Sequence, residues 1–250
     1  MKTFRTKGIA QCLYWFAKPM AVAMSFLFSL SAFSQIEEHR PDHDNWPYYF
    51  GMSISYNVST LHPEKHPQFL QNDSVLSVEP GSSGGVALGL VGTLQLTRRI
   101  SLRANPQLII GGAKYFTYSL KYPLPPDEKP IEKKTLPSTI ISFPFQFKFN
   151  SDRIDNFRVY LLGGVKYDID LASNSQSRNA DDLVKLNKSD FGIEAGIGFN
   201  FFMRFVTFSP ELKISNGLTN VHSRDAHLKF SNVLDKLQSR MLVFTIILED

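Results

Sequence analysis

Residues 141–149 read Ile-Ser-Phe-Pro-Phe-Gln-Phe-Lys-Phe, with an apolar side chain at every odd position. Successive side chains of a β-strand point to opposite faces of a sheet, so this alternation predicts a strand with one apolar face. Seven similar runs accompany it. The eight strand candidates cover residues 50–57, 85–96, 100–110, 141–149, 158–170, 191–200, 206–215 and 239–248.

The connections between these candidates are alternately short and long. Short joints follow Thr97, Asn150 and Phe201. The long connections are residues 58–83, 121–138, 172–188 and 218–237, and the last has the apolar spacing of a short helix at 232–237. Outer-membrane barrels have short periplasmic turns and longer extracellular loops. The sequence therefore predicts an all-β, eight-stranded antiparallel up-and-down transmembrane β-barrel.

The apolar face could point outward to lipid or inward to the core of a soluble, lipocalin-like barrel. An eight-stranded barrel has an interior only just wide enough for side chains. The apolar rows are bulky, whereas the polar rows are rich in small residues such as Gly164, Gly196 and Gly198. The small volume of the barrel interior therefore favours an apolar face that points outward to lipid. The predicted lipid-facing residues are Phe143, Phe145, Phe147, Leu161, Ile193, Phe199, Phe208 and Leu212.

The polar rows then place charges of both signs in the lumen. This predicted polar network consists of Arg103, Gln107, Lys148, Arg158, Lys166, Asp168, Asp170, Glu194, Glu211 and Lys213. Isolated buried charges are costly, so near balance of sign suits a lumen plugged by ion pairs. Carboxylate pairs such as Asp168 with Asp170 could instead serve acid–base catalysis. Their position in mid-strand, facing a narrow lumen, favours a structural role.

Aromatic residues gather near the ends of the predicted strands, where amphipathic rings suit headgroup depth. The predicted interface aromatics are Trp46, Tyr48, Tyr49, Tyr115, Tyr118 and Tyr167.

The N-terminus differs from the strand pattern. Four basic residues accompany an apolar run before Ser34, which predicts a signal peptide at 1–34, a periplasmic lead-in at 35–46 and the barrel at 47–250. An N-terminal membrane anchor is the alternative, although the apolar run is shorter than the ~20 residues that a spanning helix needs. Removal of residues 1–34 takes four of the 27 basic residues and none of the 23 acidic ones, leaving 23 of each sign. Nucleic-acid binding thereby loses its electrostatic support.

Catalytic and cofactor motifs are absent from the sequence. Cys12, the single cysteine, lies in the predicted signal, and His62 and His66 lack an evident third metal ligand. No phosphate-binding loop or nucleophile elbow is present. The sequence thus predicts no enzyme activity, no cofactor, no metal and no small-molecule substrate.

Four stretches resemble the PorT family of outer-membrane β-barrels from Bacteroidota. They are residues 142–148 (SFPFQFK), 156–164 (NFRVYLLGG), 167–173 (YDIDLAS) and 208–213 (FSPELK), the last followed by Gly217-Leu218. The resemblance implies an outer-membrane accessory of the type IX secretion system, associated with gliding motility and with export of proteins that carry a C-terminal targeting domain. Outer-membrane lipids and other secretion-system proteins are the implied partners. The alternative is a small OmpX-like surface barrel with adhesive or ligand-binding loops.

Overall fold

The computed structural model describes residues 37–65, 75–121, 129–136, 138–172, 186–222 and 234–250. The chain divides into two compact units, residues 1–38 and 39–250. The first unit, which includes the predicted signal peptide, lies almost entirely outside the described residues. In the described ranges, no helix has both the length and the apolar character needed to cross a membrane.

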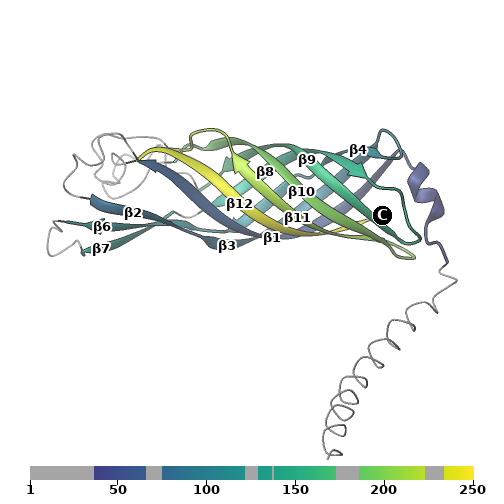
Figure 1. Ribbon diagram of the computed structural model, residues 1–250, viewed down its shortest axis with the longest axis horizontal. Coiled ribbons are helices and arrows are strands. Elements are labelled where there is room, and N and C mark those ends of the chain that lie inside the picture. Colours follow the sequence, from purple (N-terminus) through teal and green to yellow (C-terminus); the bar gives the residue numbers. More distant parts are fainter. Residues whose placement is uncertain (1–36, 66–74, 122–128, 137, 173–185, 223–233) are drawn as a thin grey trace, which may run out of the picture. The chain divides into compact units, whose positions relative to one another are not determined.

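Antiparallel strands form a closed ring in the second unit (Figure 1). Their order is β1-β12-β11-β10-β9-β8-β4-β3-β5, and pairings of β1 with β3 and of β8 with β5 close the ring. The strands are β1 (Tyr48–Lys65), β3 (Ser83–Gln95), β4 (Ile100–Ala104), β5 (Gln107–Gly111), β8 (Thr139–Asn150), β9 (Phe157–Asp170), β10 (Ser189–Phe202), β11 (Thr207–Gly217) and β12 (Leu234–Glu249).

Strands β4 and β5 are two halves of one barrel strand, because both pair with β3 on one side and β8 on the other. The sequence predicts an unbroken strand at 100–110, but Asn105 and Pro106 interrupt it. Proline has no N–H to donate to the ladder, although the Pro106 carbonyl still accepts from the Leu90 N–H at 3.0 Å. Counted this way, the described strands form a ring of eight, which confirms the predicted fold class.

The two faces of the barrel differ in polarity as predicted for a barrel in lipid. In β8, Phe145 and Phe147 are 54% and 50% exposed, whereas Gln146 and Lys148 are 1% and 0% exposed. A soluble barrel would bury the phenylalanines and expose the lysine. The soluble alternative is therefore wrong.

The two ends of the barrel are built differently. One end, here called the turn end, holds the short connections 96–99, 151–156 and 203–206 together with Asp250. The other, here called the loop end, holds a second sheet of three strands in the order β2-β6-β7 (Figure 1). These strands are β2 (Val75–Gly81), β6 (Lys114–Leu120) and β7 (Ile131–Leu136).

An apolar core, here called the loop-end core, lies beneath this second sheet. Its members are Leu61, Val75, Val78, Phe116, Tyr118, Leu120, Leu136, Leu186, Val221 and Leu237. Two of them come from β1 and β12, which extend past the ring; β12 begins at Leu234, so the helix predicted at 232–237 is wrong for its described residues. Cross-strand pairing of this segment with β1 outweighs its weak helical spacing.

A short 3-10 helix, η2 (Pro41–Asn45), lies at the turn end within the predicted lead-in. The ring of His43 packs against those of Tyr49 and Phe202, with centroid distances of 4.7 Å and 5.7 Å. The Arg40 guanidinium donates to the Thr207 hydroxyl at 3.3 Å. These contacts hold the lead-in against the barrel wall.

Candidate functional site

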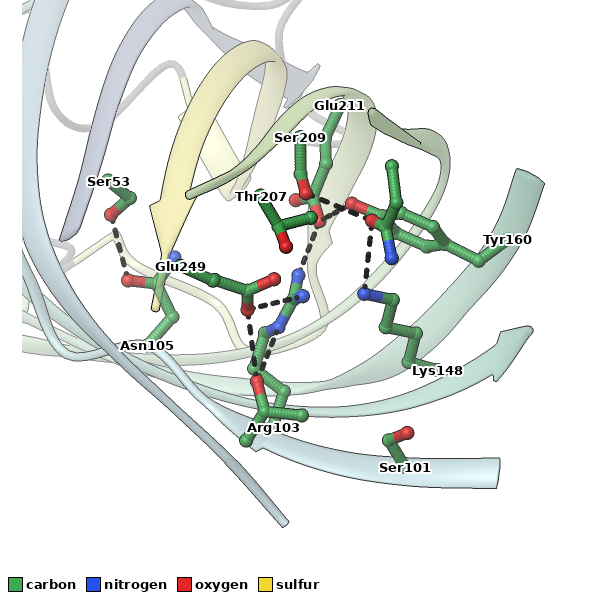
Figure 2. Close-up of polar contacts among 12 residues, drawn as sticks. Ser53, Ser101, Arg103, Asn105, Lys148, Tyr160, Thr207, Ser209, Glu211 and Glu249 are labelled. Carbon is green, nitrogen blue, oxygen red and sulfur yellow. Dashed lines mark hydrogen bonds and ion pairs between the residues drawn. The ribbon is translucent and has the colours of Figure 1, made fainter. Parts of the chain in front are cut away.

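Arg103 is the centre of a charged network that crosses the lumen (Figure 2). Its guanidinium, on β4, forms ion pairs with Glu211 on β11 and with Glu249 on β12, the latter at 2.9 Å. Its Nε donates to the Thr93 hydroxyl on β3 at 3.2 Å. The side chains of Arg103, Glu211 and Glu249 are at most 1% exposed. One cation thus links strands from different sides of the ring.

Tyr160 and Lys148 extend this network. The Tyr160 hydroxyl donates to Glu211 at 2.5 Å, and the Lys148 Nζ lies 3.9 Å from the centre of the Tyr160 ring. Lys148 also donates to the Asn200 side-chain oxygen at 3.4 Å. The tyrosine fits because residue 198 is glycine: a Cβ there would collide with the Tyr160 ring. Small residues in the polar row thus make room for long ones.

A second group of polar residues lies farther toward the loop end. Lys166 pairs with Asp168 at 2.5 Å, and the Ser142 hydroxyl donates to the same carboxylate at 2.5 Å. Gln146 donates to Glu194. The Lys213 Nζ lies 3.5 Å from the Glu211 Oε2, and Gln107 is also buried. These side chains occupy the lumen between Arg103 and the loop end.

Arg158 belongs to the turn end rather than to the central network. Its guanidinium pairs at 2.7 Å with Asp44 of η2. The N-terminal lead-in is therefore tied to the barrel by charge as well as by the rings around His43.

Two carboxylates differ from the prediction. Asp170 is half-buried at the end of β9, where it accepts from the Ala172 N–H at 2.9 Å, so it lies outside the central network. Glu249 is in the network but was not predicted. The last strand is apolar on both faces, which hides its inward row; extension of the alternation from Thr245 would have found Glu249.

The predicted lipid-facing residues all lie on the outer face. Phe143, Phe145, Phe147, Leu161, Ile193 and Leu212 are exposed, and Phe199 and Phe208 are half-buried among neighbouring rings.

The predicted interface aromatics divide into two groups. Trp46, Tyr48 and Tyr167 are exposed, and their headgroup depth stays a prediction. Tyr49 and Tyr118 are 7% and 0% exposed, so their assignment to the interface is wrong. Tyr49 has the inward parity of Ser53 and Ser55, and Tyr118 belongs to the loop-end core.

Tyr115 also lies outside the barrel ring. It is half-buried on β6, with the Lys133 Nζ 3.8 Å from its ring centre. Its environment is the second sheet rather than the outer face of the barrel.

The chemistry available to the lumen is restricted. Glu211, Glu249 and Asp168 are each engaged by cations and nearly inaccessible. Among the described residues, no group of three or more His, Cys, Asp or Glu side chains could hold a metal ion. The arrangement is suited to closing the barrel and stabilising it, because Arg103 pairs with Glu211 and Glu249, and Lys166 pairs with Asp168.

Comparisons with solved structures find other barrels at low identity. Neisserial surface protein A is 9% identical, with a TM-score of 0.40, over 79% of this chain and 95% of that chain. OprG from Pseudomonas aeruginosa is 13% identical, with a TM-score of 0.40, over 80% and 94%. Ail of Yersinia pestis is 10% identical, with a TM-score of 0.37, over 82% and 100%. No curated protein matches the chain.

A family model matches most of the chain. Its description is "Outer membrane protein beta-barrel domain", and it covers residues 33–223. The matched range includes most of the ring and the second sheet. With its apolar outer face, ion-paired lumen and eight-stranded ring, the chain belongs to the outer-membrane protein β-barrel domain family and is located in the outer membrane.

Proposed function

We propose that this protein is a closed, non-enzymatic scaffold of the outer membrane that acts through protein contacts made outside its lumen. The observation that carries the proposal is the bridge from Arg103 to Glu211 and Glu249 across the interior. A path through the barrel requires these buried charges to separate, and breaking a buried pair costs about 3–5 kcal/mol. A conduit or an accessible catalytic site is therefore disfavoured.

Conductance in planar lipid bilayers tests the closed lumen. The purified barrel should give no stepwise currents, and Arg103→Ala should give rare ones if the bridge is the main barrier. The exposed pair of Arg99 with Asp152 offers a matched control, since Arg99→Ala leaves the lumen intact. Regular open-channel currents from the unaltered protein would contradict the proposal.

Two tasks fit such a scaffold. The first is support of type IX secretion, favoured by the four stretches that resemble the PorT family; these contribute inward residues such as Lys148, Tyr160 and Glu211. Deletion of the gene should trap cargo with C-terminal targeting domains in the periplasm. Normal release of that cargo would count against this task.

The second task is adhesion or ligand binding at the cell surface, favoured by the β2-β6-β7 sheet. Outer-membrane barrels direct their longer loops outward, so this sheet faces the extracellular side. Leu76 and Ile131 are 56% and 66% exposed on it. The double variant Leu76→Asp/Ile131→Asp should abolish surface binding and leave secretion intact. The reverse pattern would favour the secretion task.

A further inference from the structure

A polar pocket of about 300 Å³ lies at the turn end, apart from the charged network of the lumen. Three segments form it: η2, the connection 96–99 and the connection 151–156, with Arg158 at the start of β9. Its charged lining consists of Arg98, Arg153, Arg158, Asp44 and Asp152. Short turns of outer-membrane barrels lie on the periplasmic side, so the pocket faces the periplasm.

The cations of this pocket are not matched by its carboxylates. Asp44 pairs with Arg158 at 2.7 Å, and Asp152 pairs at 2.9 Å with Arg99, which does not line the pocket. Within the described ranges, Arg98 has no acidic partner. The pocket therefore offers an exposed guanidinium beside two carboxylates that are already engaged.

Arg158 supplies a second, independent observation. Its side chain is 9% exposed, yet its Nε has no hydrogen-bond partner among the described residues. A buried donor without an acceptor is costly, and the cost is larger for a charged group. The guanidinium is a planar fork that matches the oxygens of carboxylate and phosphate groups.

Arg153 makes the wall of the pocket firm. Its guanidinium donates to the carbonyl oxygens of Arg40 and His39 and lies 3.9 Å from the centre of the Phe202 ring. A wall held in this way needs little rearrangement when a ligand enters, and binding to a preorganised site avoids the cost of ordering side chains.

We propose that this pocket binds an oxyanion, the carboxylate or phosphate group of a periplasmic ligand, between Arg98 and Arg158. The inference goes beyond the proposed scaffold function, because it assigns a ligand site to the periplasmic mouth and does not depend on the loop end. Failure of either proposal leaves the other standing.

Side-chain ¹⁵N NMR of the arginine Nε–H groups in the detergent-solubilised protein is the direct test. Inorganic phosphate should shift the Arg158 Nε–H resonance saturably, with chloride at equal ionic strength as the reference. Arg98→Gln should weaken the apparent phosphate affinity about tenfold, as loss of a charge-assisted hydrogen bond does. Arg204→Gln is the matched control, because Arg204 is an exposed arginine of the turn end that does not line the pocket.

Nanodiscs distinguish the two sources of the oxyanion. If a lipid headgroup occupies the pocket, phosphatidylglycerol nanodiscs will place the Arg158 resonance at its saturated position before phosphate is added. If the ligand is soluble, the shift will require added phosphate. A shift that is linear in phosphate and equal in chloride would overturn the proposal, as would equal affinities of the Arg98→Gln and Arg204→Gln variants.

Discussion

The barrel lumen and the loop-end core are interiors of opposite character in one chain. The lumen holds Arg103, Glu211 and Glu249 in mutual ion pairs, with phenylalanines outside. The loop-end core holds apolar side chains such as Phe116 and Leu237. The outward side chains around it are mostly polar, apart from the exposed Leu76 and Ile131. The first is arranged for an apolar surrounding and the second for water. The solvent therefore decides which face of these strands is buried.

Strand β1 passes through both regions and changes character along its length. Its inward row includes Ser53 and Ser55 and reaches Leu61 in the loop-end core. Its outward row changes in the opposite sense, from exposed Ile54 and Tyr56 to exposed His62. The polarity of both rows changes within a few residues of Val58.

The outward row of β12 changes polarity at the same level. Leu242 is the last exposed apolar residue of its outward row, and Arg240 continues that row toward the loop end. In the register, Leu242 pairs with Val58 and Arg240 with Thr60. The outward rows of two neighbouring strands thus change from apolar to polar at one level, where we expect the outer edge of the bilayer.

The largest expected effect comes from removing the central cation of the lumen. Arg103→Ala leaves Glu211 and Glu249 buried without their cation, which should destabilise the barrel by about 3–5 kcal/mol. Urea unfolding in detergent micelles measures this loss. The control Arg99→Ala removes only the exposed pair with Asp152 and should cost less than about 1 kcal/mol. Equal losses in the two variants would contradict the central role of Arg103.

The next effect is confined to the loop end. Phe116→Ala leaves a cavity in the loop-end core and should cost about 3 kcal/mol, the lower range for a buried phenylalanine. Hydrogen exchange should become faster in β2, β6 and β7 and stay unchanged in β9 to β11. The matched control is Phe147→Ala, where lipid can replace the lost contacts. Faster exchange throughout the barrel would show that the two interiors are not separable.

A smaller effect tests how tightly the lumen is filled. Gly198→Val puts a side chain where the Tyr160 ring lies, and overpacking of this kind should cost about 1–3 kcal/mol. At Gly163, a Cβ would have only the Glu194 carbonyl oxygen within 4.0 Å, so Gly163→Val should be tolerated. Thermal unfolding in micelles compares the two. A lumen with spare space would accept both variants equally.

The last effect is a pH dependence confined to the turn end. Burial, followed by the nearby Arg40 charge, lowers the pKa of His43 from its ordinary 6.5 to about 4. Between these two pH values His43 is protonated in the unfolded state but not in the folded state. The free energy of unfolding therefore falls as the pH drops from about 6.5 through about 4.

Hydrogen exchange of residues 41–46 measures this change locally. Exchange should accelerate at pH 4.5 relative to pH 7, after correction for intrinsic rates, and His43→Phe should remove the difference. An undiminished difference in that variant would assign the pH dependence to another group.

The sequence predicts the membrane-spanning part of the fold well because lipid imposes a strict period of two on its strands. Residues 141–149 show this most clearly: Phe145 and Phe147 are exposed, and Lys148, the one charged residue of the run, is buried. The second sheet is not predicted from the sequence, because β2 and β7 are short strands with mixed polarity on both faces.

The errors among individual residues have one physical origin. Residue type predicts Tyr49 and Tyr118 at the interface, whereas strand parity and the apolar core decide their positions. The ion pairs of Arg103 with Glu211 and Glu249 join residues more than a hundred positions apart. Alternation says that these side chains face inward, but only the closed ring determines which of them meet.

Spin-label accessibility along β1 tests the central claim most directly. A Cys12→Ser background would carry one nitroxide at a time, in reconstituted bilayers, at positions Met52, Ile54, Tyr56, Thr60, His62 and Glu64. Molecular oxygen should dominate the relaxation of the first three labels, and a water-soluble nickel complex that of the last three, with the change between residues 56 and 60. Access of the nickel complex to all six positions alike would contradict a lipid-facing barrel beneath a water-facing loop end.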